Sequence, residues 1–142
     1  MKHWLRNILL TASAGTAVLL ASLWFSLFSP WGYSPPPGLP PIAQDETHQV
    51  FAYGTLRQPL LRWLVVGRGV ATIEATLPGF RQQGRNVVAQ AGALTRGEMF
   101  TVDADELRRL DRYERLGIRY RRNRQQLTSG ASAWVYQRLD DD

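Results

Sequence analysis

The sequence predicts an α+β domain, most simply a small mixed β-barrel or a strongly curled sheet with two flanking helices, preceded by one N-terminal transmembrane helix. Short runs typical of strands occur at about 49–53, 69–77, 86–91, 94–102, 118–127 and 131–138. Two helical patterns interrupt these runs, at about 59–66 and 103–115. Many short strands with two inserted helices are typical of the α+β class.

The transmembrane helix is predicted from residues 8–28, which are 21 consecutive residues without a charge. At about 1.5 Å per residue they reach roughly 31 Å, enough to cross the core of a bilayer. Lys2 and Arg6 precede this stretch, and no basic residue follows it until Arg57. The excess of positive charge predicts a single-pass signal anchor over residues 1–29, in the cytoplasmic (inner) membrane, with the rest of the chain periplasmic. A cleaved signal peptide is the alternative.

The segment that follows, residues 30–47, is expected to be a proline-rich linker. Residues 30–41 contain six prolines, a composition that favours polyproline II and acts as a semi-rigid spacer. The remaining residues, 48–142, suffice for one domain with a modest core.

Composition excludes several classes of site. The chain has no cysteine, so disulfides, thiol catalysis and thiolate metal sites are excluded. His3 and His48 lie on opposite sides of the predicted span and cannot share a metal, and the aspartates at 140–142 are typical of a solvated tail. We therefore expect no metal site. The net charge is +5, and four arginines cluster at 119–124. We expect this cluster to be a solvated face or to contact anionic lipid. Binding to nucleic acid is not expected, because the domain is predicted to lie outside the cytoplasm.

The strand at 49–53 ends in a loop with a recognisable chemistry, Tyr53-Gly54-Thr55-Leu56. A strand that breaks at a glycine and opens into a helix exposes backbone N–H groups that can hold a carboxylate or an oxyanion. We expect glycine at position 54 because the loop needs a backbone conformation that a residue with a Cβ atom cannot adopt. An ordinary tight turn is the alternative reading of these four residues.

The elements between this loop and the second helix follow from local signals. Pro59 suits the first turn of a helix over about 59–66. Pro78 and Gly79 predict a turn after the strand at 69–77. The strands at 86–91 and 94–102 then lead into the second helix.

The second helix carries the candidate catalytic residue. Asp103 and Glu106 predict its start as a reciprocal cap, and Gly117 predicts its stop. Leu107, Leu110 and Glu114 are spaced so that they share one helical face, which the two leucines make the buried one. Desolvation and the helix dipole would raise the pKa of Glu114 from about 4.3 toward 6 or 7. Such a carboxylate is a good general base near neutral pH, whereas a frayed helix end would leave it solvated.

Five motifs taken together resemble the gamma-glutamylcyclotransferase-like superfamily, in particular its AIG2-like and gamma-glutamylamine cyclotransferase branch. They are VFAYGTLR at 50–57, GEMF at 97–100, LDRYE at 110–114, YRR at 120–122 and WVY at 134–136. The resemblance covers roughly residues 49–138 and implies a mixed β-barrel with flanking helices.

The resemblance also implies an activity. The substrate-binding residues would be Tyr53, Gly54, Thr55, Leu56 and Tyr120, with the loop amides on the glutamyl group and Glu114 as the acid/base. The implied reaction closes a gamma-glutamyl compound into 5-oxoproline and releases an amine, without cofactor or metal. The identity of the amine stays open, because residues 57–59 replace the glycine-containing turn that often follows the loop and residues 81–96 are short. The alternative function is a catalytically inactive, membrane-tethered module that binds small molecules.

Overall fold

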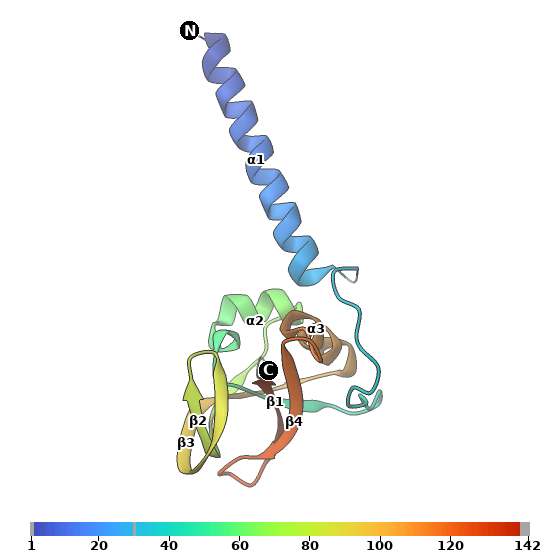
Figure 1. Ribbon diagram of the computed structural model, residues 1–142, viewed down its shortest axis with the longest axis vertical. Coiled ribbons are helices and arrows are strands. Elements are labelled where there is room, and N and C mark those ends of the chain that lie inside the picture. Colours follow the sequence, from blue (N-terminus) through green and yellow to red (C-terminus); the bar gives the residue numbers. More distant parts are fainter. Residues whose placement is uncertain (1, 30, 140–142) are drawn as a thin grey trace. The chain divides into compact units, whose positions relative to one another are not determined.

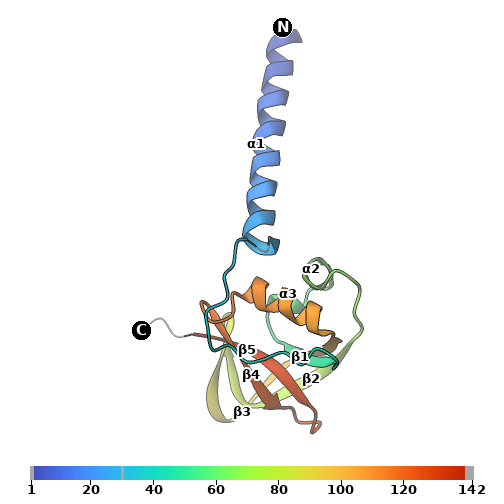
Figure 2. The same cartoon turned by 90° about the vertical axis from the view of Figure 1, so that its right-hand side faces the viewer.

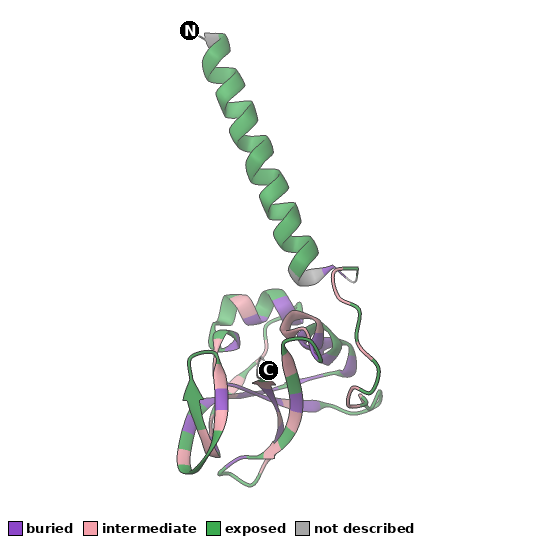
Figure 3. Ribbon diagram, viewed as in Figure 1, coloured by how far each residue is buried: buried purple, intermediate pink, exposed green. Residues whose placement is uncertain are grey.

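A computed structural model describes residues 2–29 and 31–139, which belong to two compact units, Met1–Ser34 and Pro35–Asp142. The first unit is built on helix α1, Lys2–Phe28 (Figure 1). Its segment His3–Ser26 has a mean hydropathy of 1.9 and none of its most apolar window is buried (Figure 3). Length and composition suit a membrane span, and a helix of this kind fits either an anchor or a signal sequence.

The second unit is an α+β domain. Its elements, within the described residues, are β1 (His48–Ala52), the short 3-10 helix η1 (Thr55–Arg57), α2 (Pro59–Val66), β2 (Thr72–Gln83), β3 (Asn86–Val102), α3 (Ala104–Glu114), β4 (Tyr120–Gln126) and β5 (Ser132–Arg138). The α+β class and both helices within the domain are confirmed.

The strands form one mixed sheet in the order β2-β3-β1-β5-β4. The central strand β1 is antiparallel to β3 and parallel to β5, and the outer pairs are antiparallel. The sheet is curled but not closed, so the expected barrel is wrong and the curled sheet is correct (Figures 1 and 2). The curl brings the two edges near each other, since the Thr128 N–H after β4 donates to the Thr76 carbonyl of β2 at 3.0 Å.

The expected turn at Pro78 and Gly79 and the break between two strands at 91–94 are also wrong. Both β2 and β3 continue through these positions and bend together. Between the pairs Pro78–Leu94 and Phe80–Ala89 the register shifts, with Gly79 at a positive φ of 77°. Such an irregularity bends a strand without ending it, and Pro78 is tolerated because β2 is an edge strand.

The core lies on both sides of the sheet. Strand β1 is buried on both faces, as expected for the central strand of a covered sheet. Helices α2 and α3 lie on one side of the sheet (Figures 1 and 2). The other side is filled from the curled sheet and the β4–β5 turn, in a cluster of Phe51, Tyr53, Leu77, Val87, Met99, Leu127, Ala133 and Val135.

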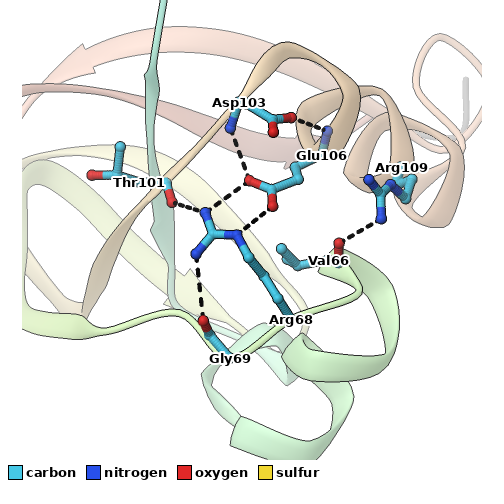
Figure 4. Close-up of polar contacts among 7 residues, drawn as sticks. All are labelled: Val66, Arg68, Gly69, Thr101, Asp103, Glu106 and Arg109. Atoms are coloured by element: carbon cyan, nitrogen blue, oxygen red, sulfur yellow. Dashed lines mark hydrogen bonds and ion pairs between the residues drawn. The ribbon is translucent and has the colours of Figure 1, made fainter.

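Helix α3 begins as predicted. The Asp103 carboxylate accepts the Glu106 N–H at 2.8 Å, and the Glu106 carboxylate accepts the Asp103 N–H at 2.9 Å (Figure 4). Arg68, just after α2, places its guanidinium on the same Glu106 carboxylate, with contacts of 2.5 and 2.9 Å. Arg109 of α3 donates to the Val66 carbonyl at 2.7 Å. These contacts fix α3 against the end of α2.

The helix ends differently from the prediction. Arg115, directly after Glu114, takes the left-handed conformation with φ 52°, and the Leu116 N–H then donates to the Asp111 carbonyl at 2.9 Å. Gly117, at φ 79°, is part of the following turn, not the residue that stops the helix. The left-handed conformation of Arg115 therefore sets the direction of the chain directly after Glu114, the candidate catalytic residue.

The proline-rich segment from Pro35 onward belongs to the second unit. The Pro40 carbonyl accepts a hydrogen bond from Arg122 Nη2 at 3.1 Å, and Arg108 donates to the side chain of Gln44. A Cβ atom at Gly117 would lie 2.4 Å from Cγ of Pro36, so the segment passes directly over that glycine. Residues 35–47 thus contact the folded domain.

Candidate active site

A cavity lies where β1 ends and α3 ends, with about 400 Å³ of empty space that is partly open to solvent. The lining residues are Phe51, Ala52, Tyr53, Gly54, Thr55, Leu56, Arg85, Glu114, Tyr120 and Tyr136. All six residues predicted as site residues from the sequence are in this set. Sequence reasoning missed the other four as site residues: Phe51, Ala52, Arg85 and Tyr136.

The loop wall of the cavity is made by the start of η1. The Arg57 N–H donates to the Gly54 carbonyl at 3.1 Å, and the Gln58 N–H donates to the Thr55 carbonyl at 3.0 Å. The N–H groups of Gly54, Thr55 and Leu56 come before this pattern begins, and the first donors of a helix have no partner within it. The three residues that the strand–glycine–helix pattern predicts as donors therefore line the cavity at the start of η1.

A close contact of a Cβ atom does not account for glycine at position 54. Gly54 has φ −112°, and a Cβ atom built on it would meet no other atom within 4 Å. Neither a left-handed backbone nor a close contact requires glycine there. The missing side chain instead leaves open space beside the loop, where a larger residue would occupy volume next to the cavity.

Glu114 is the carboxylate of this cavity. It is the last residue of α3, is partly buried, and continues the face on which Leu107 and Leu110 are fully buried. Burial raises the pKa of Glu114 from 4.5 to about 7. The predicted direction is therefore confirmed, with loss of hydration as its cause.

Three tyrosines surround the cavity, and burial is the main cause that raises the pKa of each one. The negative charge of Glu114 adds to the rise for Tyr53, Tyr120 and Tyr136, which places all three close to that carboxylate. The Tyr53 hydroxyl donates to the Tyr136 carbonyl at 2.5 Å, and the Tyr120 hydroxyl donates to the Arg85 carbonyl at 3.3 Å. The tyrosines are thus neutral hydrogen-bonding groups at neutral pH.

The hydroxyl of Tyr136 belongs to a buried polar cluster that sequence reasoning did not identify. Its hydroxyl donates to Asp111 Oδ1 at 2.5 Å, and Arg122 Nε lies 3.0 Å from the same oxygen. The Arg122 side chain is fully buried, with its guanidinium 4.2 Å from the ring centre of Trp134. The sequence signal that could have identified part of this cluster is the alternation of side chains along the strand, which places Trp134 and Tyr136 on one face.

The arrangement suits proton transfer next to a bound anion or carbonyl. A carboxylate with a pKa near 7 can both accept and donate a proton at neutral pH. Among the described residues that line the cavity, Arg85 is the one cation. No group of three or more His, Asp or Glu side chains that could hold a metal occurs in the described part of the chain, and residues 140–142 lie outside it.

Comparisons with known proteins agree with this fold. A family model described as gamma-glutamyl cyclotransferase, AIG2-like, matches residues 50–142. The solution structure of At5g39720.1 from Arabidopsis thaliana is 27% identical, covering 70% of this chain and 72% of that one with a TM-score of 0.58. The solution structure of At3g28950.1 from the same plant is 22% identical, covering 72% and 69% with a TM-score of 0.60.

A solved gamma-glutamyl cyclotransferase is 16% identical, covers 67% of this chain and 68% of its own, and has a TM-score of 0.57. At such an identity the likeness concerns the fold alone. No curated protein matches the chain at a significant level.

Proposed function

This chain belongs to the AIG2-like gamma-glutamyl cyclotransferase family, and from that premise we propose that it is a membrane-anchored enzyme that converts a gamma-glutamyl compound into 5-oxoproline and a free amine. The observation that carries the proposal is Glu114, a carboxylate with a pKa near 7 at the wall of the cavity formed by the Tyr53–Leu56 loop. A module that only binds its ligand has little use for an unneutralised acid at that place.

In the proposed reaction the α-nitrogen of the glutamyl group attacks the γ-carbonyl carbon. A carbon–nitrogen bond forms to close the five-membered ring, and the bond from that carbon to the departing nitrogen breaks. Over the whole reaction the α-ammonium nitrogen loses two protons and the departing nitrogen gains two. Glu114 accepts a proton from the attacking nitrogen and returns it to the departing one, and water exchanges the other.

The remaining cavity residues bind the glutamyl group. The amides of Gly54, Thr55 and Leu56 donate to oxygens of the substrate, and Arg85 supplies the positive charge for its α-carboxylate. The hydroxyls of Tyr53 and Tyr120 form the polar wall next to Glu114. Holding the substrate folded brings its own nitrogen to its carbonyl, and such intramolecular positioning contributes a large part of a rate enhancement.

The test replaces Glu114 by glutamine in the full-length protein and measures 5-oxoproline released from a panel of gamma-glutamyl compounds. We expect turnover to fall at least about a hundredfold while ligand binding remains, as for the loss of a general base. Glu46→Gln is the matched control, since it makes the same chemical change at an exposed position in the proline-rich segment. Equal turnover by wild type and Glu114→Gln would refute the assignment, and binding without turnover by wild type would favour an inactive binding module.

The anchor is the second part of the proposal. We infer that α1 stays in the cytoplasmic membrane with Lys2 and Arg6 inside, so that the domain is periplasmic. A reporter that is active only after export, fused behind Asp142, should be active, and one that is active only in the cytoplasm should be silent. The opposite pattern would overturn the orientation. The mass of the mature protein shows whether the apolar segment is retained or removed as a signal peptide.

A further inference from the structure

Helix α2 exposes three large apolar side chains on one face. Leu60, Trp63 and Leu64 are 71%, 51% and 47% exposed. Their spacing of three and four residues makes them the outer face of α2, and the buried residues Val65 and Val66 are on the opposite face. The helix is therefore apolar on both faces, and only one of them packs against the domain (Figure 3). Neighbouring apolar side chains that stay exposed are typical of an interaction surface.

The charges at the two ends of this outer face are positive. Arg57, which precedes α2, and Arg109 of α3, which donates to the Val66 carbonyl at the end of α2, are both exposed. Neither forms an ion pair in the described part of the chain. The carboxylates of Glu98 and Glu106 contact other arginines, in α2 and just after it, and are neutralised by them. An apolar face with free cations at its ends suits a membrane surface that contains anionic lipid.

The short connection to α1 keeps such a surface within reach. Helix α1 ends at Phe28 and the second unit begins at Pro35, so six residues, 29–34, join them. An extended chain spans at most about 3.6 Å per residue, which limits this connection to roughly 25 Å. When α1 is retained in the bilayer, the domain meets the head groups at a high effective concentration. A few interfacial side chains then suffice for docking.

We propose that the outer face of α2 docks on the same bilayer that α1 spans. Leu60, Trp63 and Leu64 would lie among the head groups and the upper acyl chains, and Arg57 and Arg109 on anionic phosphates. Tryptophan and leucine are typical of helices that lie in this boundary region. The proposal rests on the membrane anchor proposed above and not on the cyclotransferase activity.

The docked helix is joined to the wall of the active-site cavity. Arg62, on the buried face of α2, donates to the carbonyls of Leu56 and Arg57 at 2.9 and 3.2 Å. The same guanidinium forms an ion pair with Glu98 at 3.1 Å. Because Leu56 lines the cavity, docking of α2 would hold the active site close to the lipid head groups, in one orientation.

The test uses a single label, which is possible because the chain has no cysteine of its own. An environment-sensitive fluorophore is attached to Leu64→Cys in the full-length protein, in vesicles of phosphatidylethanolamine and phosphatidylglycerol that contain a spin-labelled lipid as quencher. Leu94→Cys, at an exposed leucine of β3, is the matched control and reveals any insertion caused by the label itself. We expect quenching by at least about half at position 64 and none at 94, since an interfacial helix lies about 5–10 Å deep.

Further substitutions in the labelled Leu64→Cys protein separate the apolar and charged contributions. Trp63→Ser should lower the ratio of docked to free domain roughly tenfold, because a large apolar side chain no longer enters the interface. Ile73→Ser removes a similarly exposed apolar side chain from β2 and should change nothing. Replacing phosphatidylglycerol by neutral phosphatidylcholine should weaken the quenching. The double variant Arg57→Gln with Arg109→Gln should respond less to this exchange.

The outcomes distinguish the docking from the anchor and from rival surfaces. A label at Leu20→Cys, within α1, reports the anchor: quenching there with equal quenching at 64 and 94 overturns the docking alone. If position 20 is not quenched either, the anchor fails and the docking fails with it. Protection of position 64 from a water-soluble quencher, without quenching by lipid, would assign the outer face of α2 to a protein partner and overturn the proposal. Stronger quenching at Ile118→Cys than at Leu64→Cys would also overturn it, in favour of the arginine cluster at 119–124.

Discussion

Asp111 and Glu114 are carboxylates one turn apart on helix α3, and both have lost hydration, yet their surroundings differ. Asp111 is buried against Arg122 and accepts the hydroxyl of Tyr136. Glu114 lies at the cavity wall among tyrosines, and burial without a compensating cation raises its pKa to about 7. Burial also raises the pKa of Asp111, against the opposing effects of Arg122 and Tyr136.

The difference indicates that the two carboxylates of α3 have different roles, one structural and one in proton transfer. A carboxylate that is paired and enclosed holds its neighbours in place. Asp111 in this way fixes Tyr136, which lines the cavity. A carboxylate that is desolvated but unneutralised can change its ionisation near neutral pH, and Glu114 has that property.

Removing the paired carboxylate should have the largest effect on stability. Asp111→Asn leaves the fully buried Arg122 without its counter-charge, and breaking a buried ion pair from one side costs about 3–5 kcal/mol of the free energy of unfolding. Chemical denaturation of the full-length protein in detergent measures this cost. The control is the double variant Asp111→Asn with Arg122→Met, which removes both charges and should recover much of the loss. A single variant as stable as wild type would show that the cluster does not hold the domain together.

The pH dependence of stability should distinguish the unneutralised carboxylate. The pKa of Glu114 rises from 4.5 in the unfolded chain to about 7 in the folded one, so the folded state binds the proton more tightly. Its contribution is fully present below pH 4.5 and is lost as pH rises to about 7. At about 1.4 kcal/mol per pKa unit, a rise from 4.5 to about 7 limits the loss to at most about 3–4 kcal/mol.

Glu114→Gln should remove this dependence, so the variant should match wild type near pH 4 and exceed it in stability at pH 8. Asp111 titrates in both proteins, so its effect cancels when denaturation curves of the two are compared at each pH. Parallel curves across this range would mean that Glu114 is hydrated in solution. In the assay of 5-oxoproline release, kcat/KM of the wild type should rise with pH through about 7, because the proposed base acts in its ionised form.

The parts of the site that the sequence predicts are those set by local contacts. The cap of α3 depends on side chains and amides three residues apart, so Asp103 and Glu106 specify it directly. Helical spacing alone places Glu114 on the face of Leu107 and Leu110. The loop residues Tyr53 to Leu56 likewise follow one another in the chain.

The parts that were missed depend on contacts between distant strands. Asp111, Arg122 and Tyr136 meet only because β4 and β5 pair in one register beside α3. Arg85 reaches the cavity because β2 and β3 continue through Gly79, where the local turn signal predicts an end. At Pro78 and Gly79 the pairing of β2 with β3 overrode the local preference for a turn. Whether the sheet closes into a barrel also depends on strand pairing, which local sequence signals do not specify.

The smallest effect is expected for the hydroxyl that joins the two regions. Tyr136→Phe keeps the ring at the cavity wall and removes one hydrogen bond to Asp111, which retains Arg122. A hydrogen bond to a charged group contributes about 1.5–3 kcal/mol, and the remaining partner places the expected loss at the lower end. Denaturation gives this loss, and the pH dependence of kcat/KM provides the second measurement. If Asp111 only fixes the wall, the rise in kcat/KM through about pH 7 should persist in Tyr136→Phe, with a lower maximum from a less ordered ring. Loss of that rise would mean that the pair of Tyr136 and Asp111 takes part in proton transfer, and the division between the two carboxylates would then be wrong.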